Sequence, residues 1–268
     1  MKSVRTVLRE QIDSFYLIRR LSVYEMKSKN DNRYLGVLWE IINPLIQIVI
    51  YWFVFGFGIR RGADVDGIPF FHWMLAGIVV WFFVNPAILE GSKSIYQRIK
   101  MVAKMSFPVS VIPTYIIVTN FYQHLLLLIV VLVMLLVSGA SLSVTIIQLP
   151  YYFCAAIAFL VSLTLVTSTL TTIIRDIQMI IQSIMRMLMY VTPILWTVDH
   201  LPEVIQKVMK LNPLFYLVEG YRSALLGTGW YFIDHPLYTA YFWGMTFFLF
   251  WIGSSMHVKF RGHFVDYA

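Results

Sequence analysis

The most constraining feature of this sequence is a run of 70 residues, 105–174, that contains no Asp, Glu, Lys or Arg. A helix in a soluble domain needs a polar face toward water, and so long an uncharged stretch does not provide one. A helix that spans a bilayer takes about 20 apolar residues, at a rise of roughly 1.5 Å each. The run therefore predicts two membrane spans joined by a short turn, which we expect at 138–143, where small and polar residues separate two apolar stretches.

Composition and charge spacing extend this prediction to the whole chain. Charged residues make up 13% of the sequence, against roughly a quarter in soluble domains. Six spans are expected, from windows 41–59, 67–89, 105–174 (counted twice), 177–198 and 235–258. The predicted fold is an all-α integral membrane protein with six transmembrane helices in 36–258. A cytoplasmic amphipathic interface helix in 1–35 precedes them, and a cytoplasmic tail in 259–268 follows.

Lys and Arg residues are distributed unevenly between the two sides that alternating spans define. Fifteen fall on the side of both termini, and five fall on the other side. Because cytoplasmic loops carry the excess of positive charge, we expect a multi-pass cell-membrane protein with both termini in the cytoplasm. No cleavable signal peptide is expected, since the first 35 residues are charged rather than apolar. The net charge of +7 belongs to this pattern and does not indicate a nucleic-acid partner.

The N-terminal segment has the pattern of an amphipathic helix. Its apolar residues recur at helical spacing from Val4 to Ile18, and its cations lie between them. Such a helix lies in the membrane interface, with its apolar face in lipid and its arginines among anionic headgroups. It serves either as a topological anchor or as a gate. The residues assigned to this gate helix are Arg5, Arg9, Phe15, Arg19 and Arg20.

Residues 199–234 are too long for a plain loop and too mixed in character for a span. Apolar residues recur at helical spacing over 201–211, Asn212-Pro213 interrupts the pattern, and a second helical pattern runs over 214–226 to Gly227. We expect two short re-entrant helices between spans five and six, dipping into the outer leaflet and packed against protein, where their backbone groups are satisfied.

Motifs for catalysis are weak. Gly91-Ser92-Lys93-Ser94 resembles the end of a phosphate-binding loop, but the leading glycine and the preceding strand are missing, so a helix-start turn is expected there. One cysteine and six scattered histidines show no metal-ligand spacing. A membrane acyl- or glycosyltransferase stays open as an alternative, although its only His–Asp neighbours, at 199–200 and 234–235, fit turns or helix starts better. We expect no cofactor in this chain.

A family resemblance covers almost the whole chain in the right order. The segments that carry it are YLGVLWE at 34–40, NPL at 43–45, SI at 94–95, KMSFP at 104–108, IP at 112–113, RDI at 175–177, TPI at 192–194, LNPL at 211–214 and Arg222. Together they resemble the permeases of ABC-2-type polysaccharide exporters. Three shorter segments, at 15–18, 25–29 and 51–56, most resemble permeases for wall teichoic acid in Gram-positive bacteria. Permeases for capsule or O-antigen polysaccharide, and multidrug ABC-2 exporters, are the alternatives.

The resemblance implies a half-transporter and its partners. Two copies of this chain would assemble with two separate ABC ATPase subunits, which bind the ATP and magnesium. The cargo would be a polymer linked to a polyprenyl diphosphate lipid, carried from the inner leaflet outward for cell-wall assembly. The basic stretch 91–104, which has helical spacing, is a candidate coupling helix, although a loop that only sets topology is the alternative. The residues assigned to coupling are Ser94, Ile95, Arg98, Lys100, Lys104, Phe107 and Pro108.

The cargo path is predicted from charge and aromatic residues. Arg186 lies alone in the fifth expected span, and a charge near mid-membrane faces protein or water. It is assigned to the diphosphate or a polymer phosphate, and an internal ion pair is the alternative. Aromatic rings gather near span ends, as in any membrane protein, but some of them suit a sliding sugar or polyol chain. The other residues assigned to the path are Tyr51, Trp52, Trp73, Arg60 and Arg61, although a solvated loop is the favoured alternative for the two arginines.

Overall fold

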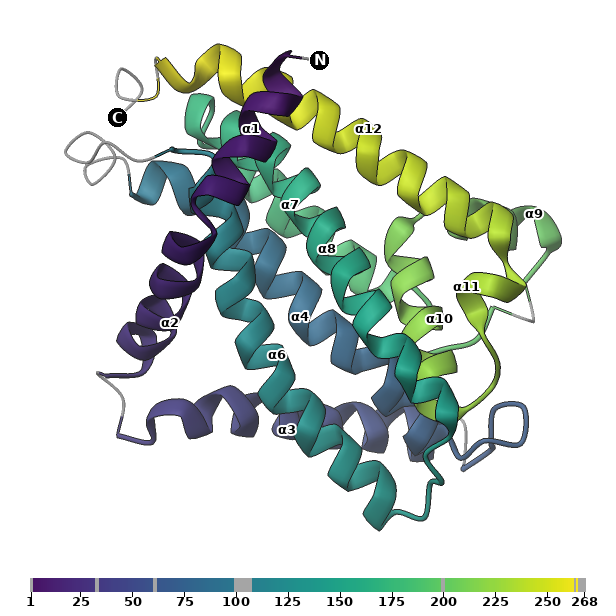
Figure 1. Ribbon diagram of the computed structural model, residues 1–268. Coiled ribbons are helices and arrows are strands. Elements are labelled where there is room, and N and C mark those ends of the chain that lie inside the picture. The colour runs from purple at the N-terminus through teal and green to yellow at the C-terminus, as the bar shows by residue number, and fades with distance from the viewer. Residues whose placement is uncertain are drawn as a thin grey trace.

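The computed structural model describes residues 2–31, 34–59, 62–98, 108–198, 201–262 and 264. Within these residues the regular structure is helical, apart from one isolated β-bridge between Val65 and Ile68. Figure 1 shows the arrangement. The elements are α1 (Lys2–Asp13), α2 (Phe15–Asp31), η1 (Gly36–Leu38), α3 (Trp39–Tyr51), η2 (Trp52–Ile59), α4 (Phe70–Gln97), α6 (Val111–Val137), η3 (Val144–Gln148), α7 (Leu149–Ile173), α8 (Ile177–Val191), α9 (Glu203–Met209), α10 (Pro213–Leu226), α11 (Tyr231–Asp234) and α12 (Pro236–Phe260).

Four helical segments of the described chain are long and apolar enough to cross a membrane. They are Gly36–Ile59 (η1, α3 and η2 together), α4, α6 and Val144–Ile173 (η3 with α7), and they correspond to the first four expected spans. The helix α8 has 15 residues, or about 22 Å at roughly 1.5 Å per residue, and α12 has 25, or about 37 Å. The count of six spans therefore stays a prediction for these last two helices.

The end of the second span was predicted wrongly. We expected the span to end at Leu89 and a new helix to start near Gly91, but α4 continues without interruption to Gln97. Charged residues at 90, 93 and 98 gave the appearance of a loop. In the structure Glu90 is neutralised by an ion pair with Lys29 of α2, and the helix continues past it to Gln97. Arg98, which follows the last residue of α4, is paired with Glu25 of α2.

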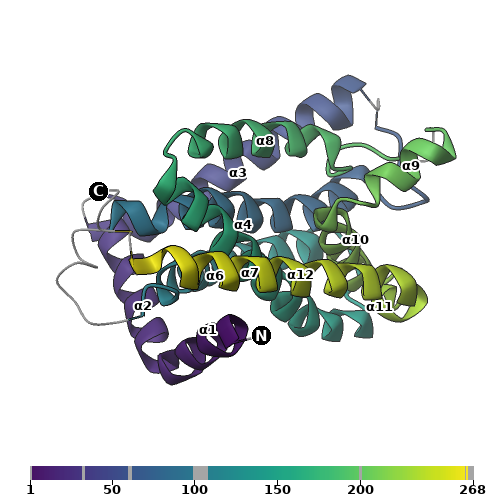
Figure 2. The same cartoon turned by 90° about the horizontal axis from the view of Figure 1, so that it is seen from above.

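The helix α4 is the centre of the bundle. It packs against α6, α7, α8 and α10, and 72% of its apolar window is buried inside the protein, against 11% for the first segment, Gly36–Ile59. Figure 2 shows α3 and α8 on the same side of the layer that contains α4, α6, α7 and α12. Much of the surface of these two outer helices is therefore free of contact within the chain.

The N-terminal amphipathic segment forms two helices instead of one. Ser14 separates α1 from α2, and the chain changes direction there (Figure 1). The helix α1 packs on α12, while α2 packs along α6. Val7 and Ile18 are buried by these contacts. Each half thus follows a different partner helix, which a single hydrophobic periodicity does not reveal.

The segment between α8 and α12 contains the two expected short helices, α9 and α10, and a third of four residues, α11. Asn212 caps α10, because its side-chain oxygen accepts a hydrogen bond from the Leu214 N–H at 3.0 Å. Gly227 ends α10 with a φ of 77°, a left-handed conformation that favours glycine. The helix α10 is buried against α4, α7 and η3, whereas its insertion into the outer leaflet stays a prediction.

Candidate transport site

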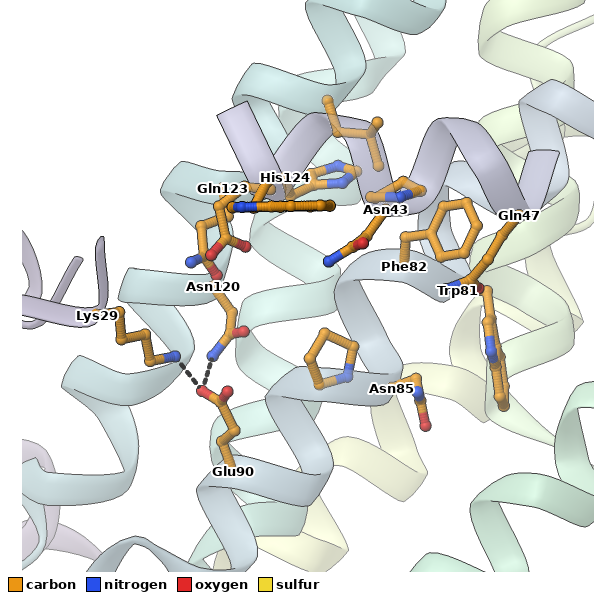
Figure 3. A pocket seen from close by; sticks show the side chains of 15 residues that line it. Lys29, Asn43, Gln47, Trp81, Phe82, Asn85, Glu90, Asn120, Gln123 and His124 are labelled. Carbon is orange, nitrogen blue, oxygen red and sulfur yellow. Dashed lines mark hydrogen bonds and ion pairs between the residues drawn. The ribbon is translucent and has the colours of Figure 1, made fainter. Parts of the chain in front are cut away.

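A polar cavity lies between α2, α3, α4 and α6, inside the part of the bundle that the first spans form. Its volume is about 450 Å³. Figure 3 shows side chains from all four helices pointing toward it, with α3 crossing over the other elements. Six of its polar side chains are Asn43, Gln47, Asn85, Glu90, Asn120 and Gln123. Asn43 and Gln47 are exposed in the single chain, whereas the other four are buried or half-buried, so the α3 side of the cavity is open.

One end of the cavity is closed by a hydrogen-bonded group of three residues. The Lys29 ammonium of α2 forms an ion pair with the Glu90 carboxylate of α4, and the Asn120 amide of α6 donates to the same oxygen at 3.0 Å (Figure 3). All three are buried or half-buried. A second ion pair, between Glu25 and Arg98, joins α2 to α4 beyond this group. The N-terminal helix α2 is therefore tied to the end of the second span by two charge pairs.

The other amides of the cavity are unsatisfied by protein. Among the described residues, none forms a hydrogen bond with the side chain of Asn43, Gln47, Asn85 or Gln123. Asn43 and Gln47 are four residues apart, so they lie on the same face of α3. This spacing of two amides in an otherwise apolar span is visible in the sequence, but the predicted cargo path rested on charge and aromatic residues and did not include it.

The described path residues lie on different helices of the single chain, and their role in a path stays a prediction. Arg186 is exposed on α8, where its guanidinium donates to the Ser183 hydroxyl at 3.1 Å. Tyr51 and Trp52 lie at the junction of α3 and η2, on a separate helix. Arg60 and Arg61 fall outside the described residues. The alternative partner for Arg186, Asp176, lies ten residues away, or about 15 Å along a helix, which is too far for an ion pair.

Trp73 lies in a different environment from the one predicted. It is buried near the start of α4, and the Arg222 guanidinium of α10 stacks over its ring, 3.5 Å from the centroid. Arg222 also donates to Glu219 at 2.6 Å and to the Ile194 carbonyl at 2.9 Å. Burial lowers the pKa of Arg222 and Glu219 raises it, and an arginine stays charged under these conditions. Trp73 is therefore largely covered by Arg222 and anchors α10, and its role in the cargo path stays a prediction.

A glycine makes the approach of Arg222 to α4 possible. A Cβ atom added to Gly77 would lie 2.6 Å from the Arg222 Nη2 and 3.0 Å from its Cζ. Any larger residue at this position would force the guanidinium out of its place. The arginine motif that contributed to the family resemblance is thus a packing element between α10 and the first turns of α4.

The predicted coupling residues are only partly described. Ser94 and Ile95 are fully buried in α4, so a docking protein would not touch their side chains. Arg98 is paired with Glu25 and lies over the Tyr115 ring. Pro108 precedes α6 and is half-buried. Lys100, Lys104 and Phe107 lie outside the described residues, and the coupling role stays a prediction for them.

The predicted gate residues lie on the outside of α1 and α2. Arg5, Arg9, Phe15, Arg19 and Arg20 are all exposed. Arg9 forms an exposed ion pair with Asp13 within α1. The helix α1 is held in place by Glu10, which accepts hydrogen bonds from Arg261 and from Ser110. A gating movement would have to break these contacts, and the role itself stays a prediction.

Comparisons with known proteins all match this chain to membrane transport proteins. The sequence profile of a family described as "ABC-2 type transporter" matches residues 16–226. The chain is 24% identical over 201 residues to the O-antigen export system permease protein RfbA of Myxococcus xanthus, covering 74% of this chain and 76% of that one. It is 25% identical over 213 residues to RfbA of Klebsiella pneumoniae (79% and 81% covered). It is 22% identical over 225 residues to the inner membrane transport permease YadH of Escherichia coli K12 (80% and 85% covered).

Proposed function

We propose, from the premise that this chain belongs to the ABC-2 type transporter family, that it carries a lipid-linked polysaccharide outward across the cytoplasmic membrane. The chain is the membrane subunit of an exporter, and the cargo is the proposed part. Two relatives are named as O-antigen export permeases, which supports a polysaccharide cargo. The observation that carries the proposal is that about three quarters of the chain matches both the family profile and a permease named for O-antigen export.

The energy for transport is proposed to come from a partner. The sequence holds no complete phosphate-binding loop, so two ABC ATPase subunits would bind ATP and magnesium and dock on the cytoplasmic side. In the proposed topology α8 and α12 cross the membrane as spans five and six, and both termini are cytoplasmic. The end of α4, with α2 tied across it, then faces the ATPase side.

A second copy of the chain is the proposed partner for α3, η2 and α8. The outer face of α8 carries Gln182, Ser183 and Arg186 among apolar residues, and all three are exposed. Lipid is a poor environment for an arginine, and such residues face protein or a water-filled space in known membrane proteins. Two copies related by a two-fold axis would turn these faces toward each other. The cargo would then pass between the copies, with Arg186 near its diphosphate.

Cross-linking tests this arrangement. Val54 on η2 and Val133 on α6 are both half-exposed, but only Val54 is on the proposed interface. In a C154A background, we expect a short bismaleimide to link most V54C chains into dimers in native membranes. V133C, whose side chain would face lipid, should stay monomeric. Equal dimer yields from the two variants, or none from V54C, would contradict the interface.

Wall teichoic acid, favoured by short sequence segments, is the second candidate cargo. Neither RfbA protein nor YadH is named for teichoic acid export, so these segments alone support it. The two cargoes differ in charge, because each repeating unit of a teichoic acid carries a phosphate. A neutral glycan does not carry this charge, and a permease for it would be indifferent to phosphate in the polymer.

ATP hydrolysis by the reconstituted complex distinguishes the candidates. The chain and its candidate ATPase would be placed in vesicles with a neutral glycan or a teichoic acid precursor, each on the same polyprenyl diphosphate. We expect the neutral glycan to stimulate hydrolysis about as well as, or better than, the phosphate polymer. Stimulation by the teichoic acid precursor alone would move the assignment to that polymer. Stimulation by neither would contradict polysaccharide export.

A further inference from the structure

The cavity between α2, α3, α4 and α6 has the size of a ligand site. Its volume of about 450 Å³ falls within the roughly 300–1,000 Å³ of small-molecule sites. It lies within one copy of the chain, beside the poorly buried first span, Gly36–Ile59. The family match does not assign it a role, and it is separate from the face that carries Arg186.

The side chains that line the cavity can both donate and accept hydrogen bonds. Four side-chain amides, from Asn43, Gln47, Asn85 and Gln123, have no hydrogen-bond partner among the residues that the structure describes. Each amide offers two N–H donors and a carbonyl acceptor in one plane. A hydroxyl group also donates and accepts, so a ring with several neighbouring hydroxyls can satisfy these amides together. Figure 3 shows Asn43 and Gln47 entering from α3 and Asn85 from α4.

Aromatic rings complete the lining. Trp39 lies at the start of α3, and Trp81 and Phe82 lie on α4. A sugar ring has apolar C–H groups on its faces and hydroxyls around its edge. Flat aromatic rings can pack against the C–H groups, and amides can form hydrogen bonds with the hydroxyls. A purely apolar ligand would leave the four amides unsatisfied, which is costly.

The charges of the cavity disfavour an anion. Among the residues that the structure describes, its lining contains one cation, Lys29, and two carboxylates, Glu40 and Glu90. Lys29 is already paired with Glu90. A phosphate in this space would compete with Glu90 for that single cation, and it would lie close to a carboxylate at low dielectric, where repulsion is strong. The other nearby cations, Lys93 and Arg98, line a separate small pocket beyond the Lys29–Glu90 pair.

We propose that this cavity binds a neutral, hydroxyl-rich ring, the class to which the sugar units of a glycan belong. The identification of that ring as part of the cargo rests on the proposed function. In the proposed orientation the cavity opens in the cytoplasmic half of the membrane, next to α2. It receives a sugar unit before the polymer reaches the space between the two copies.

Ligand binding to the full-length chain in lipid nanodiscs tests the proposal. The probes are a neutral hexose disaccharide and glycerol 3-phosphate, followed by saturation-transfer NMR, in which ligand protons report contact with protein. We expect transfer to the disaccharide and at least fivefold less to glycerol phosphate. The double variant N43L/Q47L should reduce disaccharide transfer at least fivefold. Its control, S141L, replaces an exposed polar side chain in the turn between α6 and η3, away from the cavity and from the proposed interface, and should leave transfer unchanged.

A charge variant tests the reason for the selectivity. E90Q removes one carboxylate and releases Lys29. Saturation transfer to glycerol 3-phosphate should therefore be at least threefold greater with E90Q than with the wild-type chain. Equal binding of both probes by the wild-type chain would overturn the proposal. The proposal would also be overturned if the wild-type chain did not bind the disaccharide, if N43L/Q47L bound it as well as the wild-type chain, or if E90Q showed no gain in glycerol-phosphate transfer.

The reconstituted ATPase assay separates the cavity proposal from the proposed function. Stimulation by glycan without cavity binding refutes the cavity alone, whereas cavity binding without stimulation refutes glycan export alone.

Discussion

An R222L variant should yield little folded protein, with a loss of stability of about 3–5 kcal/mol. The reason is that a buried charge pair is broken on one side, which leaves Glu219 without its partner. The carbonyl of Ile194 and the face of Trp73 also lose their contact. The measurement is the fraction of monodisperse protein after heating in mild detergent, followed by size-exclusion chromatography of the tagged chain.

The matched control for this prediction is R186L. It makes the same replacement at an arginine whose side chain is exposed and whose only hydrogen bond in the described structure is to Ser183. We expect R186L to be as stable as the wild-type chain. R222K should recover only part of the stability, because an ammonium cannot reproduce the planar fork that reaches Glu219 and Ile194 together. Equal stability of R222L and R186L would contradict the anchor role of Arg222.

Replacement of Arg186 should instead impair transport. R186Q keeps a polar side chain but removes the charge proposed to meet the diphosphate of the cargo lipid. A hydrogen bond to a charged group contributes about 1.5–3 kcal/mol, so we expect export in reconstituted vesicles to fall about tenfold to a hundredfold. Assembly with the ATPase should be unaffected, since the side chain of Arg186 is exposed in the single chain.

The control for R186Q removes an exposed cation elsewhere. K207Q breaks only an exposed pair with Glu203 within α9, and such pairs contribute little. Its export rate should match that of the wild-type chain, and R186K should retain more activity than R186Q. Full transport by R186Q would eliminate a cargo role for Arg186 and leave it as an interface residue.

Local signals in the sequence were sufficient for much of the helical pattern. In the structure α10 begins after Asn212 and ends before Gly227. The N-cap, the fixed φ of the proline and the left-handed glycine each determine the backbone within a few residues of themselves. The turn at 138–143 likewise follows directly from small and polar residues between apolar runs, and α6 ends at Val137. Each of these features depends on neighbours in sequence alone.

Features that depend on distant partners could not be predicted in the same way. Glu90 and Arg98 are paired with residues 61 and 73 positions earlier, so the charge of Glu90 does not end α4, which continues to Gln97. The stacking of Arg222 on Trp73 joins residues 149 positions apart. The cavity is defined by four helices at once. Periodicity within one helix shows which face is apolar, but it does not show which polar residues of other helices will meet it.

The contact between Arg222 and α4 also bears on the synthesis of the chain. Trp73 and Gly77 leave the ribosome long before Arg222, which follows Trp73 by 149 residues. At roughly 5–20 residues per second, the start of α4 is synthesised about 7–30 s before Arg222. During that interval the space beside Gly77 lacks the guanidinium that fills it in the complete chain. A chain that terminates before Arg222 would keep this space open where α10 otherwise packs on α4.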